Sequence, residues 1–384
     1  MPRTKTRATD GRRIESMIRE LVEFHHDEGV LSVYLDIDPA TAGREGYEAA
    51  LIELWKPLHA RPHDAWLGGR LEYEIAAVTE EVRAWEEAPG RAVAMFFSGP
   101  GSLRAVLPLR TPVRPLARFE PRPVLSPLIA AIDEHRRYGI VVFDKGRARI
   151  LTVFLGEVEE EVMIEADGLG RTSVGGWGGY LQARYARHRE HHLHEHARRT
   201  AERLWAIAQE RPLHTLVLGG PEEALVALRV VLPRALAGLV VGTLPIEMFA
   251  GTAEIVGRVA DVEAAARQQE DRELVEELTV GARKGAHAVL GWDDTLQALA
   301  EGRVHVLVLA GMPGGAGVEC PEGHVLARGD ELQVCPFCGE GLWHVDDVAE
   351  AAVRAALHTD ARVHAISGGS QGLGRHGAGA ILRY

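Results

Sequence analysis

The chain has 384 residues and a formal net charge of −12 at pH 7, and this length predicts two or three domains. Hydrophobic residues make up 46% and charged residues 26% of the sequence, which is typical of a soluble globular protein. No apolar run approaches the ~20 residues that span a bilayer, so we expect no membrane partner.

Basic residues gather in three segments although the chain as a whole is acidic: residues 1–13, 104–122 and 184–203. The first segment lacks a following apolar core, so it is not a secretory signal. The net negative charge argues against a generic nucleic-acid binder. An acidic body with separate basic patches fits local RNA contact, or a partner that supplies its own basic surface.

The first domain is expected over residues 1–107, and a Pro-rich linker is expected over residues 108–127. Each proline of the linker disfavours helix and removes a backbone donor. The predicted elements of the first domain are helices at 13–28, 46–58 and 69–87 and strands at 31–38 and 92–97.

A central domain is expected over residues 128–280. Two apolar runs on either side of the turn Asp144-Lys-Gly146 predict a β-hairpin, and an uninterrupted stretch with apolar residues at helical spacing predicts a long helix at 183–210. The other predicted elements are strands at 157–165, 214–218 and 239–244 and helices at 221–236 and 252–278. Strands that alternate with helices after an antiparallel start imply a mixed sheet covered by helices.

The third domain is expected over residues 281–384. Its predicted elements are helices at 288–301 and 345–357 and strands at 304–309, 362–366 and 378–382. The fold class is therefore α/β, with three small α/β domains, of which the last is an α/β/α unit with an inserted zinc knuckle.

Two short ligand pairs, Cys320-Pro-Glu-Gly-His324 and Cys335-Pro-Phe-Cys338, are separated by ten residues. Their spacing and turn-forming residues match a zinc knuckle, and three cysteines cannot build a disulfide framework. We expect one structural Zn²⁺ held by Cys320, His324, Cys335 and Cys338, with His344 as the alternative fourth ligand. A closed site of this kind leaves no open position for zinc chemistry, and its thiols fit a reducing cytoplasm.

The sequence His192-Leu-His-Glu195-His196 spells the inverted zinc-protease pattern H-x-x-E-H. On a helix, His192 and His196 share a face, which makes a metalloprotease a distant functional alternative. The other interpretation is that these histidines form a titratable cationic face near phosphate.

A glycine-rich stretch, Gly175-Gly-Trp177-Gly-Gly179, runs straight into the predicted long helix. Its backbone can adopt φ > 0 and approach a partner closely. The alternative interpretation is a surface loop followed by a solvated helix face. Gln182 follows the glycines and is the candidate catalytic residue. Its amide and backbone N–H can orient a water and stabilise an oxyanion when an ester carbonyl is attacked.

The run Gly178-Gly-Tyr-Leu-Gln-Ala-Arg-Tyr-x-Arg-His188 resembles the central-domain signature of bacterial relatives of the archaeo-eukaryotic class-1 release factor and Pelota superfamily. That superfamily includes the Vms/ANKZF-type peptidyl-tRNA hydrolases of ribosome quality control and the Balon-type hibernation factors. The cysteine knuckle and the ending Gly-Ala-Gly-Ala-Ile-Leu-Arg-Tyr384 extend the resemblance over about residues 31–384. Release factors place Gln directly after Gly-Gly, whereas here Tyr180 and Leu181 intervene, a displacement of up to ~7 Å if the segment is extended.

The resemblance implies a cytoplasmic, ribosome-associated translation factor that enters the A site. Gln182, with Gly178 and Gly179, would hydrolyse peptidyl-tRNA in stalled complexes, and the alternative is a non-catalytic hibernation or occupancy factor. The partners implied are rRNA, tRNA or peptidyl-tRNA, and an EF-Tu-type translational GTPase. Aromatic residues would stack on nucleotides and cationic residues would hold phosphates; the RNA-binding residues are Trp177, Tyr180, Arg184, Tyr185, Arg187, His188 and Arg189.

Overall fold

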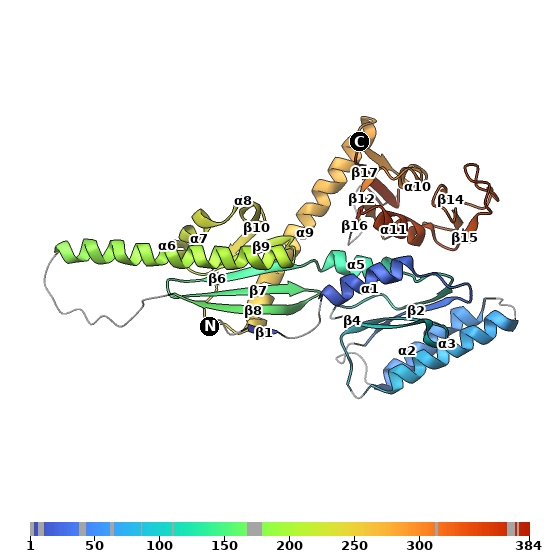
Figure 1. The fold of residues 1–384 in the computed structure, drawn as a ribbon, viewed down its shortest axis with the longest axis horizontal. Coiled ribbons are helices and arrows are strands. Elements are labelled where there is room, and N and C mark those ends of the chain that lie inside the picture. Colours follow the sequence, from blue (N-terminus) through green and yellow to red (C-terminus); the bar gives the residue numbers. More distant parts are fainter. Residues whose placement is uncertain are drawn as a thin grey trace. The chain divides into compact units, whose positions relative to one another are not determined.

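The computed structural model describes residues 4–6, 11–37, 44–61, 65–85, 87–109, 111–166, 179–311, 314–366, 373–374 and 376–384 (Figure 1). For residues 179–189 it describes the backbone but not the side chains. The chain forms two compact units: unit 1 holds residues 1–11 and 136–270, and unit 2 holds residues 12–135 and 271–384. Both combine sheets with helices, so the predicted α/β class is confirmed.

Unit 1 is built on a six-stranded sheet with the order β1-β8-β7-β6-β9-β10. Its strands are β1 (Thr4–Thr6), β6 (Tyr138–Phe143), β7 (Arg147–Phe154), β8 (Glu157–Glu165), β9 (Thr215–Gly219) and β10 (Val240–Leu244). The strands from β1 to β6 are antiparallel neighbours, whereas β9 and β10 run parallel to β6. The expected mixed sheet and its opening hairpin are therefore confirmed.

Helices cover both faces of this sheet. On one face, α6 (Gly179–Glu210) and α7 (Glu222–Val231) pack their apolar side chains on β6, β7 and β9. On the other face, Ile255 and Val259 from the start of α9 (Thr252–Arg283) pack on the same strands. The helix predicted at 221–236 is divided, because Pro233 begins a separate short helix, α8 (Arg234–Ala237).

The N-terminal half of unit 2 has an antiparallel sheet with the order β4-β3-β2-β5. Its strands are β2 (Val30–Asp36), β3 (Ala92–Ser98), β4 (Leu103–Leu109) and β5 (Leu116–Glu120). Its helices are α1 (Gly11–Glu23), α2 (Arg44–His59), α3 (Ala65–Arg83), α4 (Gly99–Ser102) and α5 (Ser126–Glu134). The core between α2, α3 and the sheet is made of aliphatic and aromatic side chains.

The proline-rich segment that suggested a linker contains a strand and the start of a helix. β5 pairs with β2 at the edge of the sheet, and α5 begins at Ser126. β5 itself contains no proline, and Pro115 and Pro121 flank it. Pro108 lies in β4 at the other edge of the sheet, where proline is tolerated because one side of an edge strand donates no ladder hydrogen bonds.

The C-terminal half of unit 2 has a four-stranded sheet with the order β11-β17-β12-β16 and a three-stranded sheet with the order β14-β13-β15. Its strands are β11 (Ala288–Leu290), β12 (Val304–Leu309), β13 (Gly317–Glu319), β14 (Leu326–Arg328), β15 (Trp343–Val345), β16 (Arg362–Ala365) and β17 (Ala378–Leu382). Its helices are α10 (Trp292–Ala300) and α11 (Val348–His358). The helix predicted at 288–301 is wrong at its start, because Ala288–Leu290 pairs with β17 and Gly291, at φ 93°, separates it from α10.

Polar contacts join the two halves of unit 2. The backbone N–H of Ala365 donates to the Asp133 carboxylate at 2.8 Å, and the ring of His364, which is fully buried, lies 2.6 Å from the Asp271 carboxylate. Within the described residues, every helix is too short or too polar to cross a membrane.

Candidate functional site

Four candidate metal ligands come together in unit 2. The ligand atoms of Cys320, His324, Cys335 and Cys338 all lie within 4.8 Å of one another. The Cys320 Sγ lies 3.6 Å from the Cys338 Sγ and 3.8 Å from the His324 Nδ1. Two sulfurs bound to one tetrahedral zinc ion at ~2.3 Å lie about 3.8 Å apart, so the cluster has the dimensions of a zinc site.

Two similar backbone turns build this cluster. The N–H of Gly323 donates to the carbonyl of Cys320 at 2.9 Å, and the N–H of Gly339 donates to the carbonyl of Cys335 at the same distance. Both glycines have positive φ, 76° and 80°, a conformation that glycine adopts without a steric penalty. The turn-forming residues noticed in the sequence therefore bring each ligand pair together.

The thiols of the cluster influence one another. Burial raises the pKa of the Cys335 thiol, but hydrogen bonds from the backbone of Cys338 and Phe337 outweigh it and lower that pKa to about 7. A backbone hydrogen bond at Glu340 lowers the pKa of the Cys338 thiol, but burial and the neighbouring thiols outweigh it and raise that pKa to about 11. Sulfurs packed this closely deprotonate together only beside a cation, which is what a bound metal supplies.

The structure favours His324 over His344 as the fourth ligand. His324 belongs to the cluster, whereas His344 pairs with Val318 in the three-stranded sheet and is not part of it. Three thiolates and one imidazole form a closed donor set that suits zinc in a structural role.

The H-x-x-E-H pattern on α6 does not form a metal site within the described residues. The cysteine–histidine cluster is the one group of three or more metal-ligating side chains found there. His196 is buried and stacks on Phe143, with ring centroids 4.9 Å apart. Glu195 forms an ion pair with Arg198 at 3.0 Å. The pattern therefore reflects one core histidine beside exposed polar residues.

The candidate catalytic and RNA-binding residues lie at the start of α6 and just before it. Trp177 and Gly178 are outside the described residues. Gly179 is the first residue of α6. The other candidates lie in the first three turns of that helix, where the backbone alone is described: Tyr180, Gln182, Arg184, Tyr185, Arg187, His188 and Arg189.

α6 is much longer than the part of it that packs on the sheet. It has 32 residues, and Leu193 is the first of them, among the side chains described, to join the core of unit 1. At a rise of 1.5 Å per residue, Gln182 lies roughly 16 Å beyond Leu193 along the helix axis. Figure 1 shows this end of α6 extending past the sheet. The helix therefore carries the candidate residues away from the domain body.

Because this segment is helical, the two residues inserted before Gln182 change its position both along and around the helix axis. Gly179 and Gln182 lie in one helix, so two extra residues move the backbone position by ~3 Å along the axis and by about 200° around it. The displacement of ~7 Å, which holds for an extended segment, does not apply to this helix. Positions 182 and 193 differ by only about 20° around the helix, so Gln182 lies on the continuation of the face that packs on the sheet.

The charged residues at the start of α6 divide between two faces. By helical periodicity, Tyr180, Arg184 and Arg187 share one side, and Tyr185 and Arg189 lie on the side of Gln182. Positions 184 and 187 therefore lie on the opposite side of the helix from position 182.

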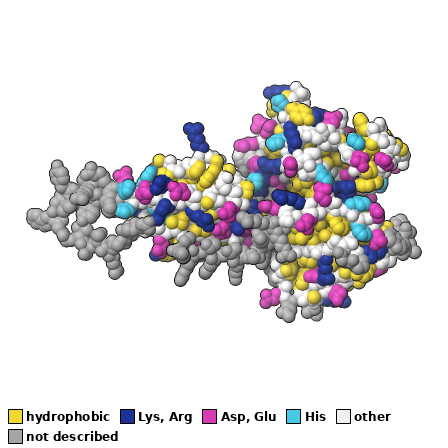
Figure 2. Space-filling view, viewed as in Figure 1, with side chains coloured by type: hydrophobic (Ala, Val, Ile, Leu, Met, Phe, Trp, Pro, Cys, Tyr) yellow, Lys and Arg dark blue, Asp and Glu magenta, His cyan; other side chains and the backbone are white. Residues whose placement is uncertain are grey.

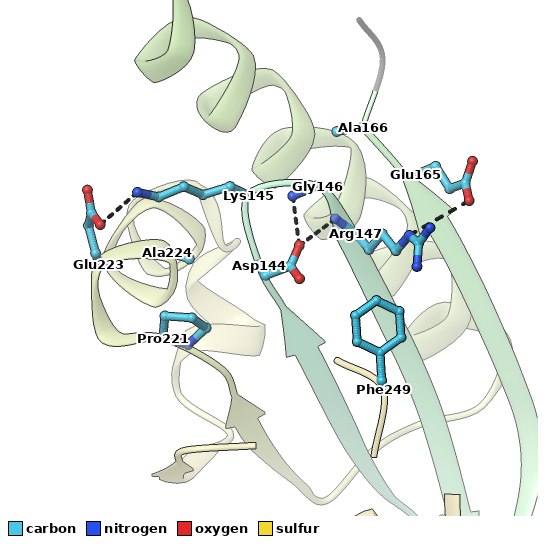
Figure 3. A pocket seen from close by; sticks show the side chains of 10 residues that line it. All are labelled: Asp144, Lys145, Gly146, Arg147, Glu165, Ala166, Pro221, Glu223, Ala224 and Phe249. Atoms are coloured by element: carbon cyan, nitrogen blue, oxygen red, sulfur yellow. Dashed lines mark hydrogen bonds and ion pairs between the residues drawn. The ribbon is translucent and has the colours of Figure 1, made fainter. Parts of the chain in front are cut away.

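Sequence reasoning missed a cleft of about 770 Å³ in unit 1 (Figure 3). It lies where β8 ends, because Ala166, the last described residue before the glycine-rich segment, lines it. The guanidinium of Arg147 lies over the exposed ring of Phe249, 5.3 Å from its centroid. Lys145 pairs with Glu223 at 2.8 Å. Arg147 also lies 3.9 Å from the carboxylate of Glu165, so both cations of the cleft already face a carboxylate. The sequence signal was limited to the turn at residues 144–146.

Comparison with known families identifies the central part of the chain. Residues 123–266 match the family model "Bacterial archaeo-eukaryotic release factor family 10". This match supports membership of the archaeo-eukaryotic release factor superfamily for the central part of the chain. The matched residues begin before α5 and include the whole sheet of unit 1 except β1, together with the glycine-rich segment and all of α6.

Solved structures of Pelota, Dom34 and a termination factor align with almost the full length of this chain, at low identity and low TM-scores. A ribosome-bound archaeal Pelota, from a model with ABCE1, is 13% identical, covers 96% of this chain and 94% of its own, and gives a TM-score of 0.42. Dom34 of S. cerevisiae is 10% identical, with coverages of 100% and 97% and a TM-score of 0.40. The archaeal termination factor aRF1 is 14% identical, with coverages of 97% and 98% and a TM-score of 0.27. No curated protein matches the sequence.

Proposed function

We propose that this protein is a ribosome-associated, release-factor-like translation factor that hydrolyses peptidyl-tRNA in stalled ribosomal complexes. The observation that carries the proposal is the family match over residues 123–266, which contains the glycine-rich segment and α6. The reach of α6 supports it, because a residue roughly 16 Å beyond the packed part of a helix can enter a site that the domain body cannot.

In this proposal, the amide of Gln182 orients the attacking water and donates to the oxyanion of the ester, together with the backbone N–H groups near Gly178 and Gly179. The first N–H groups of a helix have no partner within it and point outward, and the positive end of the helix dipole favours negative charge there. α6 begins at Gly179, so its N-terminus presents such donors close to Gln182. The reaction adds water across the ester and releases the peptide from the tRNA.

The same helix would hold RNA in the A site of the ribosome. Arg184, Arg187, Arg189 and His188 would contact phosphates, and Trp177, Tyr180 and Tyr185 would stack on nucleotides. We further propose a structural zinc ion at the cysteine–histidine cluster, an EF-Tu-type translational GTPase as a protein partner, and action in the cytoplasm.

One observation favours a second candidate, a factor that occupies the ribosome without catalysis. Gln182 is turned by about 200° relative to the position directly after the glycine pair, so it is on the side of α6 that continues the packed face. A hibernation or occupancy factor needs the binding residues of α6 but does not need Gln182.

A peptide-release assay separates the two candidates. Wild type and Gln182→Ala are compared under single-turnover conditions on stalled ribosomes carrying labelled peptidyl-tRNA, beside a binding assay with empty ribosomes. Loss of an oxyanion donor typically costs ~10²–10³ in rate, so the hydrolase proposal expects a loss of that size with binding retained. Wild-type protein that binds ribosomes and releases no peptide would establish the occupancy factor instead.

A further inference from the structure

A short arm beside the metal cluster is almost entirely exposed. We name residues 331–341 the knuckle arm; within it Cys335 alone is buried. The arm is a small hairpin: Val334 bridges to Gly341, the N–H of Cys335 donates to the carbonyl of Glu340 at 2.8 Å, and the Cys335–Gly339 turn closes its tip. An arm with one buried side chain contributes little to the core of unit 2, so its sequence serves another purpose.

The exposed side chains of the arm include three large apolar ones. Phe337 at the tip is 76% exposed, Val334 is 53% exposed and Leu332 is 42% exposed. Leu332 and Val334 are two residues apart in a hairpin strand and so face the same side. A single exposed apolar residue needs no explanation, but several gathered on one small projection mark an interaction surface.

The arm is connected to the rest of unit 2 at the metal cluster, where Cys335 and Cys338 meet Cys320 and His324. Phe337 lies beside the ligand His324, with ring centroids 6.3 Å apart, and the two turns of the metal cluster join the arm to β13 and β14. A surface that is already ordered loses little conformational entropy when a partner binds. An aromatic side chain on such a surface is the usual kind of binding hot spot.

The charge around the arm identifies the chemistry of the partner. Four exposed acidic residues, Glu322, Asp330, Glu331 and Glu340, surround it, and within the part of the chain that the structure describes none of them forms an ion pair. The arm itself contains no lysine or arginine. Three thiolates and a neutral histidine around Zn²⁺ would add a further negative charge. Phosphate is repelled by such a surface, whereas a basic protein surface is attracted to it.

We propose that the knuckle arm is a docking surface for a basic protein, with Phe337 as the apolar anchor and Glu331 and Glu340 as its electrostatic rim. This proposal rests on the proposed function, and the partner is therefore a basic protein of the ribosome and not rRNA. The complementary surface holds a hydrophobic recess flanked by lysine or arginine.

Affinity for purified 70S ribosomes tests the anchor. Phe337→Ala and Val334→Ala weaken binding by about tenfold or more, as expected for loss of a buried anchor. Ile52→Ala, on α2 and 59% exposed, is the matched control and leaves affinity unchanged. Metal content and urea unfolding equal to wild type confirm that each variant is folded. Equal affinity of Phe337→Ala and wild type overturns the proposal, and so does an equal loss in the control.

Charge reversal distinguishes a protein partner from RNA by the sign of its effect. Glu331→Lys with Glu340→Lys weakens ribosome binding if the arm meets a basic protein and strengthens it if the arm meets RNA. The control is Glu276→Lys with Glu277→Lys, at exposed positions of α9. Strengthened or unchanged binding of the arm variant overturns the proposal, and so does arm-dependent dimerisation of the free protein. If wild-type protein does not bind ribosomes at all, the proposed function is wrong, and so is the ribosomal partner. If wild-type protein binds and the arm variants bind with the same affinity, only the docking surface is wrong.

Discussion

The carboxylate of Glu350 on α11 accepts the backbone N–H of Leu125, 225 residues away, at 2.8 Å. The same carboxylate accepts the N–H of Ser126 at 3.1 Å and the hydroxyl of Ser126. It therefore supplies acceptors to the start of α5, where the first N–H groups have no partner within the helix. One side chain of the C-terminal half of unit 2 thus caps a helix of the N-terminal half.

Glu350→Ala is expected to loosen this junction. Hydrogen bonds to a charged group contribute about 1.5–3 kcal/mol each, so unit 2 should lose roughly 2–3 kcal/mol of stability in urea unfolding. Amides at the start of α5 should exchange faster in hydrogen-exchange mass spectrometry, while those of β6 and β7 in unit 1 should not change. Glu350→Gln retains one acceptor oxygen and should lose less. Unaltered exchange at Leu125 and Ser126 would contradict this role.

Glu120 is expected to make the stability of unit 2 depend on pH. Burial, followed by the negative charges of Asp346 and Glu350, raises the pKa of Glu120 from 4.5 to about 7. A carboxyl group whose pKa is raised by folding binds its proton more tightly in the folded state, so its contribution to stability is full below pH 4.5 and declines as the pH rises to 7.

Glu120→Gln should therefore become more stable relative to wild type as the pH rises from 5 to 8. A shift of this size corresponds to at most about 3 kcal/mol between the two pH limits. Urea unfolding at a series of pH values measures the difference, with Glu276→Gln on the exposed face of α9 as the control. A difference between variant and wild type that stays constant with pH would disprove the prediction.

The metal cluster is expected to hold about one equivalent of zinc. Purified protein prepared without chelator should contain it, and Cys335→Ser should lose it and destabilise the C-terminal half of unit 2, since metal binding and folding are coupled. His324→Ala should also lower the metal content, whereas His344→Ala should not, because His344 is outside the cluster. Elemental analysis decides this prediction. Metal-free protein, or loss on His344→Ala alone, would refute the ligand set.

The start of α6 is expected to contact RNA. Replacing Arg184, Arg187 and Arg189 with Glu should weaken ribosome binding, and the affinity of wild type should fall with salt more steeply than that of the variant. Arg198→Glu is the control, because Arg198 lies on the same helix but pairs with Glu195 and Glu202. If the triple variant binds as tightly as wild type with the same salt slope, this end of α6 is only a solvated surface.

Local patterns in the sequence were sufficient for much of the fold and for the metal cluster. The hairpin at residues 138–154 was predicted because its turn residues and alternating strands are neighbours, and the four ligands were predicted because two short turns hold each pair. The prediction errors lie where pairing with distant residues determines the local secondary structure. Ala288–Leu290 is a strand because β17, about ninety residues later, pairs with it, and β5 is a strand because β2 does.

The candidate site on α6 was only partly accessible to sequence reasoning. The length of the helix followed from the absence of glycine and proline, but the phase of Gln182 around it depends on where the helix begins, at Gly179. The cap by Glu350 carried no sequence signal, because a lone glutamate near the start of α11 has no feature that points to residues 125 and 126.

The discontinuous assembly of unit 2 has a consequence for how the protein is made. Its N-terminal half leaves the ribosome first. Glu350, which caps α5, and Ala365, which donates to Asp133, follow more than 200 positions later in the sequence. At ~5–20 residues per second of synthesis, the 225 residues between Leu125 and Glu350 take roughly 10–45 s to appear. Residues 136–270, the larger part of unit 1, are translated within that interval. During this interval, the surface of the N-terminal half that will contact the C-terminal half stays uncovered. A chaperone can engage the growing chain at that surface.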